Sequence, residues 1–97
     1  YKIINNTLYD LKGKIIIAYW GHDKIVQVEK WTKGIGKNAF FQSNIEIIDL
    51  TNSQIKIVHE SAFYRCFNLH SIQISKGTML QYRSLLPTYL QVLIQEI

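Results

Sequence analysis

The chain has 97 residues, of which 47% are hydrophobic and 19% are charged, and its formal net charge is +4. This length limits it to one domain, and the hydrophobic content is enough for a continuous core, which excludes a disordered chain. The lysines are scattered singly through strand-like and turn-like sequence, which is not the pattern of a nucleic-acid-binding protein.

Cysteine content and hydropathy exclude further classes. Cys66 is the only cysteine, so an intramolecular disulfide and a multi-cysteine zinc site are both excluded. The longest apolar run, from Ile15 to Trp20, is far shorter than the roughly 20 residues of a membrane span. The chain begins at Tyr1 without a signal-peptide pattern, so we expect any targeting signal to lie outside it and the chain to be a piece of a longer protein.

Residues 1–23 predict a β-hairpin followed by a turn. Residues 1–9 and 14–19 are rich in β-branched and aromatic side chains, and Asp10 and Gly13 lie between them. We expect Gly13 to take the positive φ that a tight connection requires. Asn5-Asn6-Thr7 is a glycosylation sequon, which is used only if the chain passes through a secretory pathway.

Two later stretches nearly repeat one another. Ile35-Gly-Lys-Asn-Ala-Phe40 leads to Ile45-x-x-Ile48-x-Leu50, and Val58-His-Glu-Ser-Ala-Phe63 leads to Leu69-x-x-Ile72-x-Ile74. A unit of about 23 residues with apolar anchors in fixed order predicts a solenoid, in which each unit covers the hydrophobic face of its neighbour.

Each unit contributes one short strand. Residues 24–28 form the first, with Val26 and Val28 on one face and Gln27 on the other. Val26, Ile48 and Ile72 occupy equivalent positions, so we expect the three strands to stack as parallel neighbours.

The repeat weakens after Ile74, where Ser84-Leu85 replaces the Ala-Phe pair and Pro87 interrupts the pattern. We interpret residues 75–97 as a degenerate terminal repeat, either a cap for the stack or a truncated unit. An apolar strand at a sheet edge invites pairing with another chain, so edge-to-edge self-association is also expected. The single domain therefore divides into a hairpin and turn at 1–23, repeats at 24–74 and a terminal unit at 75–97.

The repeat pattern, with Ala-Phe, a small residue or Cys three positions after the Phe, and then Leu-x-x-Ile-x-Ile, resembles the BspA-like or Treponema pallidum type of leucine-rich repeat. Residues 35–43 carry the first copy and residues 55–74 the fuller second copy. The departures affect turn geometry: Gly36 becomes His59 in the second copy, and Thr51 stands where the family usually has proline. The resemblance implies a β-rich α/β leucine-rich-repeat solenoid, in which the N-terminal β-hairpin precedes short parallel strands, with turns or short helical segments on the other face.

Candidate catalytic and metal-binding residues are few. Cys66 has His59 and His70 nearby in sequence, as a cysteine nucleophile or a metal site would require. Cys66 nevertheless occupies the small-residue position of the repeat, so we interpret it as a core side chain. No paired carboxylates, phosphate-binding loop or nucleophile elbow occurs, and we predict a chain that is not an enzyme and binds no metal or cofactor.

The two tryptophans have two possible roles. Trp20 and Trp31 are either exposed ligand anchors or parts of the core and hairpin packing. Their apolar neighbours favour packing.

The outward-facing positions of the three parallel strands are the candidate binding site. They would form a strip of three rungs about 4.8 Å apart. The positions are Ile25, Gln27, Ile47, Asp49, Ser71 and Gln73. Apolar side chains at two of them indicate either an interaction patch or ordinary isolated exposure.

Similar repeats belong to bacterial and protozoan surface proteins implicated in adhesion to host proteins or to other cells. The resemblance therefore implies a non-catalytic protein-binding or adhesion module, secreted or at the cell surface, with a protein partner. The alternative is a cytoplasmic leucine-rich-repeat scaffold for protein assembly, and a domain accessory to an enzyme is a third hypothesis.

Overall fold

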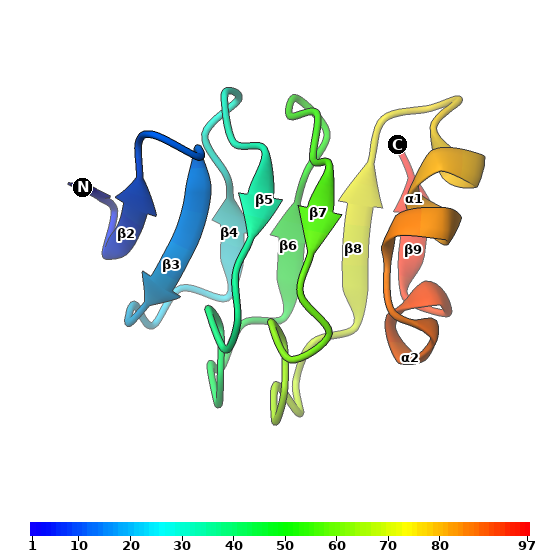
Figure 1. Cartoon of the computed structure of the whole chain (residues 1–97). Helices are drawn as coiled ribbons and strands as arrows, with labels where there is room; N and C mark the ends of the chain where they lie inside the picture. The colour runs from blue at the N-terminus through cyan, green and yellow to red at the C-terminus, as the bar shows by residue number, and fades with distance from the viewer.

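The computed structural model describes all 97 residues, which form two sheets and a pair of short helices (Figure 1). The strands are β1 (Lys2–Ile4), β2 (Thr7–Asp10), β3 (Ile15–Tyr19), β4 (Ile25–Gln27), β5 (Gly34–Ile35), β6 (Ile47–Asp49), β7 (Ile57–Val58), β8 (Ser71–Ile74) and β9 (Ile94–Glu96). The helices are α1 (Met79–Leu85) and α2 (Thr88–Gln91). The five-strand sheet has the order β1-β2-β3-β5-β7, and the four-strand sheet has the order β4-β6-β8-β9.

The four-strand sheet is parallel throughout and stacks equivalent residues of successive repeats. Val26 pairs with Ile48, Ile48 with Ile72, and Ile72 with Ile94. Ile48 and Ile72 are 0% exposed, because this row of β-branched side chains points into the core. The predicted equivalence of Val26, Ile48 and Ile72 is confirmed, and β9 adds a fourth strand from the terminal unit.

The other face of the repeats is a second sheet. β5 and β7 continue the five-strand sheet in parallel with β3, so that Ile16, Ile35 and Val58 form one row. The expectation of turns or short helical segments here is therefore wrong in part, since the only helices follow β8. The physical reason lies in the backbone: the N–H of Lys33 donates to the carbonyl of Lys14 at 2.8 Å, and the N–H of Lys56 donates to the carbonyl of Lys33 at 2.7 Å, which holds these residues extended.

Gly34 permits close packing between β5 and β7. A Cβ atom on Gly34 would lie 2.6 Å from Cγ2 of Ile57 and 3.3 Å from its carbonyl oxygen. Because glycine has no Cβ, Ile57 can lie over the backbone of the preceding repeat.

The N-terminal region is a three-stranded antiparallel arrangement rather than one hairpin. Asn5 and Asn6 take positive φ values of 50° and 59°, which asparagine tolerates, and the chain folds back so that β1 pairs with β2. The expectation for Gly13 is also wrong, because Lys14 takes the positive φ of 57° instead. In the loop between β2 and β3 the left-handed residue is the last one, Lys14, which directly precedes β3.

The Ala-Phe pairs place aromatic rings between neighbouring repeats. The ring of Phe40 lies 5.1 Å from that of Tyr19 and 5.1 Å from that of Phe63, and Phe40 is 0% exposed. The N–H groups of Tyr19 and Phe40 donate to the carbonyls of Ala39 and Ala62, both at 2.8 Å. Small alanines permit this backbone approach, while the rings fill the layer between repeats.

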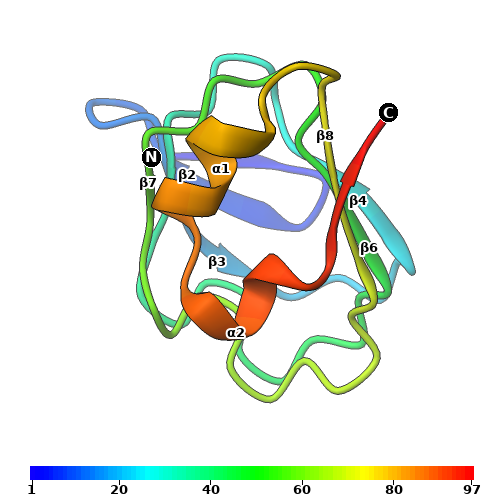
Figure 2. The same ribbon diagram turned by 90° about the vertical axis from the view of Figure 1, so that its right-hand side faces the viewer.

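The terminal unit closes one end of the core. Figure 2 shows α1 and α2 lying across that end. Tyr82 of α1, Leu90 of α2 and Leu86 between the helices are buried. Neither helix has the length or the apolar run that a membrane-spanning helix requires.

Candidate functional site

The six outward positions lie in two rows across β4, β6 and β8. Ile25 pairs with Ile47, and Ile47 with Ser71. Gln27 pairs with Asp49, and Asp49 with Gln73. The structure thus brings all six together in the predicted arrangement, and their role in binding stays a prediction.

The accessibility of these positions differs from one end of the rows to the other. Ile25 is 60% exposed, whereas Ser71 is only 2% exposed. Ser71 is covered because its Oγ donates to Oε1 of Gln95 at 2.6 Å, and Gln95 pairs with Gln73 in the next strand. The surface available to a partner therefore excludes Ser71 and includes Gln95.

The sequence pattern does not predict Gln95 as part of this surface, because the repeat weakens after Ile74. One signal was present, since Ile94 follows Ile72 at the same 22-residue spacing that separates Val26 from Ile48. That spacing places the residue after Ile94 beside Gln73.

Asp49 is the one charged residue of the six, and its side chain is fixed. Its Oδ1 accepts hydrogen bonds from the backbone N–H of Thr51 at 2.9 Å and from the Thr51 hydroxyl at 2.6 Å. This local turn holds the carboxylate in place without an ion pair. A fixed carboxylate is preorganised, so that a partner donor would meet it without further ordering cost.

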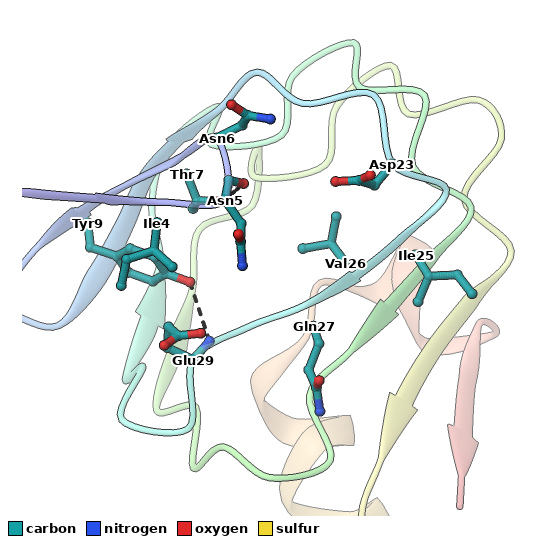
Figure 3. A pocket seen from close by; sticks show the side chains of 10 residues that line it. All are labelled: Ile4, Asn5, Asn6, Thr7, Tyr9, Asp23, Ile25, Val26, Gln27 and Glu29. Carbon is teal, nitrogen blue, oxygen red and sulfur yellow. Dashed lines mark hydrogen bonds between the residues drawn. The ribbon is translucent and has the colours of Figure 1, made fainter.

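A polar cavity of about 270 Å³ lies beside β4, at the end of this face (Figure 3). Ile25 and Gln27 line both the face and the cavity. Asn5 enters the cavity from the turn between β1 and β2, and Asp23 and Glu29 lie on either side of β4. No Lys, Arg or His side chain lines the cavity, so its charge is negative while the net charge of the chain is +4.

The wall of this cavity is held by hydrogen bonds from the core. The backbone N–H of Glu29 donates to the hydroxyl of Tyr9 at 3.3 Å, and burial raises the pKa of Tyr9 (Figure 3). The Thr7 hydroxyl donates to the carbonyl of Asn5 at 3.1 Å. Thr7, the last residue of the sequon, is 3% exposed, which fixes the turn that presents Asn5.

Cys66, His59 and His70, the candidate catalytic or metal-binding residues, each interact with a different partner. Sγ of Cys66 donates to the carbonyl of Phe40 at 2.9 Å, and burial raises the pKa of the thiol. Nδ1 of His59 lies 2.9 Å from Oγ of Ser61, and Nε2 of His70 lies 3.7 Å from Oε1 of Glu46. No three His, Cys, Asp or Glu side chains of the chain form a group that could hold a metal ion.

The two tryptophans behave differently. Trp31 is partly buried, and its ring lies 4.8 Å from that of Tyr9. Trp20 is 48% exposed, so the packing interpretation is wrong for this residue. Tyr19 takes the core position at the end of β3, and the next side chain along a strand points to the opposite side.

The repeated geometry agrees with a comparison against protein families. A family model described as a BspA type leucine-rich repeat region, with six copies, matches residues 23–91. The chain belongs to the BspA-type leucine-rich repeat family. The BspA-type match runs from just before β4 to the end of α2, and it therefore includes the rows formed by β4, β6 and β8. Leucine-rich repeats of this kind are protein-interaction modules and are generally non-enzymatic.

No curated protein and no solved structure matches this BspA-type chain.

Proposed function

We propose that the chain is a non-catalytic protein-binding module that contacts its partner through the outward face of the four-strand sheet. The observation that carries this proposal is the alignment of outward side chains in two rows across β4, β6 and β8. In this proposal the stacked repeats act as a short solenoid, with one strand of the face per repeat.

The composition of the face suits a protein partner. Ile25 and Ile47 are adjacent apolar side chains in one row, and Gln27, Asp49 and Gln73 form the polar row beside them. Protein interfaces combine an apolar centre with polar groups that fix the register. Burying a side chain such as Ile25 against a partner contributes about 1.5 to 3 kcal/mol.

The test is a triple variant with Ile47→Ala, Asp49→Ala and Gln73→Ala, assayed for binding to a panel of purified extracellular-matrix proteins by surface plasmon resonance. For a panel protein that binds the unmodified chain, we expect the variant to weaken affinity by at least about tenfold. We expect the variant to stay folded with a small fall in melting temperature, because these side chains point away from the core but Asp49→Ala removes two hydrogen bonds to Thr51.

A matched control replaces one isoleucine, one acid and one glutamine elsewhere on the surface. Ile57, Glu60 and Gln81 are all exposed and lie outside the four-strand sheet. Their alanine triple variant should bind as the unmodified chain does. Unaltered affinity of the face variant, or an equal loss in the control, would move the site to another surface.

A cell-surface or secreted adhesion role belongs to the same proposal and is supported by the family resemblance. The alternative is a cytoplasmic scaffold for protein assembly. A glycan on Asn5 of the protein isolated from its source organism would support the surface role, because that modification occurs in the secretory pathway. Recovery of the protein in the cytosolic fraction would favour the scaffold.

A further inference from the structure

One edge of the four-strand sheet carries backbone groups without a neighbouring strand. β4 pairs only with β6. The N–H of Ile47 donates to the carbonyl of Lys24 at 3.0 Å, and the N–H of Val28 donates to the carbonyl of Asp49 at 3.3 Å. Alternate residues of a parallel strand bond to the same neighbour, so the N–H and C=O groups of Ile25 and Gln27 face away from β6.

There is space beside these free groups. The cavity of about 270 Å³ runs along this edge, and Asn5 and Tyr9 lie on its opposite side (Figure 3). The amides of Asn5 and Gln27 offer hydrogen-bond donors and acceptors to whatever enters it. The edge is therefore bounded by polar side chains but is not covered by another strand or helix.

Two carboxylates beside this edge form no ion pair within the chain. Asp23 and Glu29 lie at opposite ends of β4, and neither forms a salt bridge, because both ion pairs of the chain involve Glu46. The nearest partner of the Asp23 carboxylate is the Tyr19 hydroxyl at 3.5 Å. Two unpaired carboxylates at the ends of an open strand are complementary to a segment with cationic side chains at both ends.

We propose that the free edge of β4 accepts an extended basic segment of the protein partner, which adds a strand to the four-strand sheet. Ile25 and Gln27 bond to the backbone of the added segment, and Asp23 and Glu29 pair with its Lys or Arg side chains. Asp23 and Glu29 are six residues apart and a strand rises about 3.3 Å per residue, so a segment of roughly six to seven residues reaches from one carboxylate to the other. This inference rests on the proposed protein-binding function and specifies where the partner's backbone lies.

A second copy of the chain fits this edge less well. The other free edge of the sheet is β9, in which Ile94 continues the row of Val26, Ile48 and Ile72. If β9 of a second copy joined β4 in this register, Glu96 would lie beside Val28 and next to Glu29. Like charges at neighbouring positions oppose such pairing.

The test uses a synthetic peptide of alternating threonine and valine with a lysine at each end, titrated into the full chain at low ionic strength. Amide chemical shifts in a heteronuclear NMR spectrum are expected to change at Ile25, Gln27 and their neighbours. A peptide with glutamates at its ends, and a lysine peptide with N-methylated backbone amides, are both expected to cause no change.

The double variant Asp23→Asn and Glu29→Gln should weaken binding of the lysine peptide by about tenfold. The control variant Asp10→Asn and Glu60→Gln removes two carboxylates elsewhere and should bind as the unmodified chain does. Equal binding of the glutamate or N-methylated peptide, shifts that avoid β4, or no binding would each overturn the proposal. A concentration-dependent dimer with β4 amides protected from exchange would overturn it in favour of a second copy.

The two proposals fail in different ways. If the Ile47, Asp49 and Gln73 triple variant binds partners normally while the lysine peptide still shifts β4, the face is wrong and the edge stands. If partner binding depends on the face but the peptide does not bind, only the edge proposal fails.

Discussion

Cys66 occupies the small-residue position of the repeat, where it contacts the backbone of the preceding repeat. It lies three residues after Phe63, and its thiol donates to the carbonyl of Phe40 in the preceding repeat. Ser43 holds the equivalent position in the first copy, where its Oγ accepts a hydrogen bond from the N–H of Ile45 at 3.1 Å. Both side chains form hydrogen bonds at this position of the repeat, which accounts structurally for a small residue there.

We predict that the Cys66 thiol reacts slowly in the folded chain. Burial raises the pKa of Cys66, and the thiolate is the reactive form, so the folded chain should react with Ellman's reagent near pH 8 at least about tenfold more slowly than the chain in denaturant. Because the folded state keeps the thiol proton to a higher pH than the unfolded state, this contribution to stability is complete below the unfolded pKa and is lost as pH rises from there through the folded pKa. Cys66→Ser should remove this part of the pH dependence. Rapid reaction of the folded chain would instead indicate an exposed, activated thiol.

In the terminal unit, a residue of β9 caps the start of α1, which lies earlier in the sequence. α1 begins at Met79, and the side chain of its N-cap residue, Thr78, makes no capping hydrogen bond. Oε2 of Glu96 in β9 accepts from the N–H groups of Gly77 at 2.8 Å and Met79 at 3.2 Å. β9 thus caps the helix that precedes it, and a carboxylate at a helix N-terminus is also favoured by the helix dipole.

We therefore predict that Glu96→Ala lowers the free energy of unfolding by about 1 kcal/mol, the usual effect of losing a helix cap. Glu96→Gln keeps an oxygen acceptor but loses the charge, so its effect should be smaller. Urea denaturation followed by circular dichroism measures both. Glu60→Ala removes an exposed carboxylate that caps no helix and should have little effect; an effect as large as that of Glu96→Ala would contradict the capping role.

The whole molecule has a single core that joins both sheets and the terminal helices. Its 21 buried hydrophobic residues form one cluster, from Tyr9 in β2 to Leu90 in α2. The chain measures 31 × 28 × 21 Å, so no part of it is remote from this cluster. A core of this kind favours cooperative unfolding, whereas long repeat arrays can unfold unit by unit.

We predict that a substitution in α2, at one end of the molecule, also destabilises the end that contains Trp31 and Tyr9. Leu90 is 2% exposed in α2, and Leu90→Ala should lower stability by about 2 to 5 kcal/mol. Trp31 packs on Tyr9 at the far end, yet tryptophan fluorescence and far-UV circular dichroism should report the same lowered urea midpoint. Val92→Ala is the control, since Val92 is 86% exposed and should cause no shift. A fluorescence midpoint that did not move with Leu90→Ala would show that the units unfold separately.

The repeated spacing alone determined the parallel stack and its register. Val26, Ile48 and Ile72 recur at nearly constant intervals, and a side chain must alternate with its neighbours along a strand, so the two outward rows followed directly. These features depend on local periodicity, which a single sequence shows.

Contacts between distant segments were decided only by the tertiary structure. β5 has two residues and no periodicity to predict it, and it is a strand because β3 and β7 supply hydrogen-bond partners on both sides. The cavity beside β4 likewise forms because the Asn5 turn folds back beside Glu29, with Tyr9 joining them. Such contacts arise from packing between residues far apart in the chain, and local sequence carries no record of which segments meet.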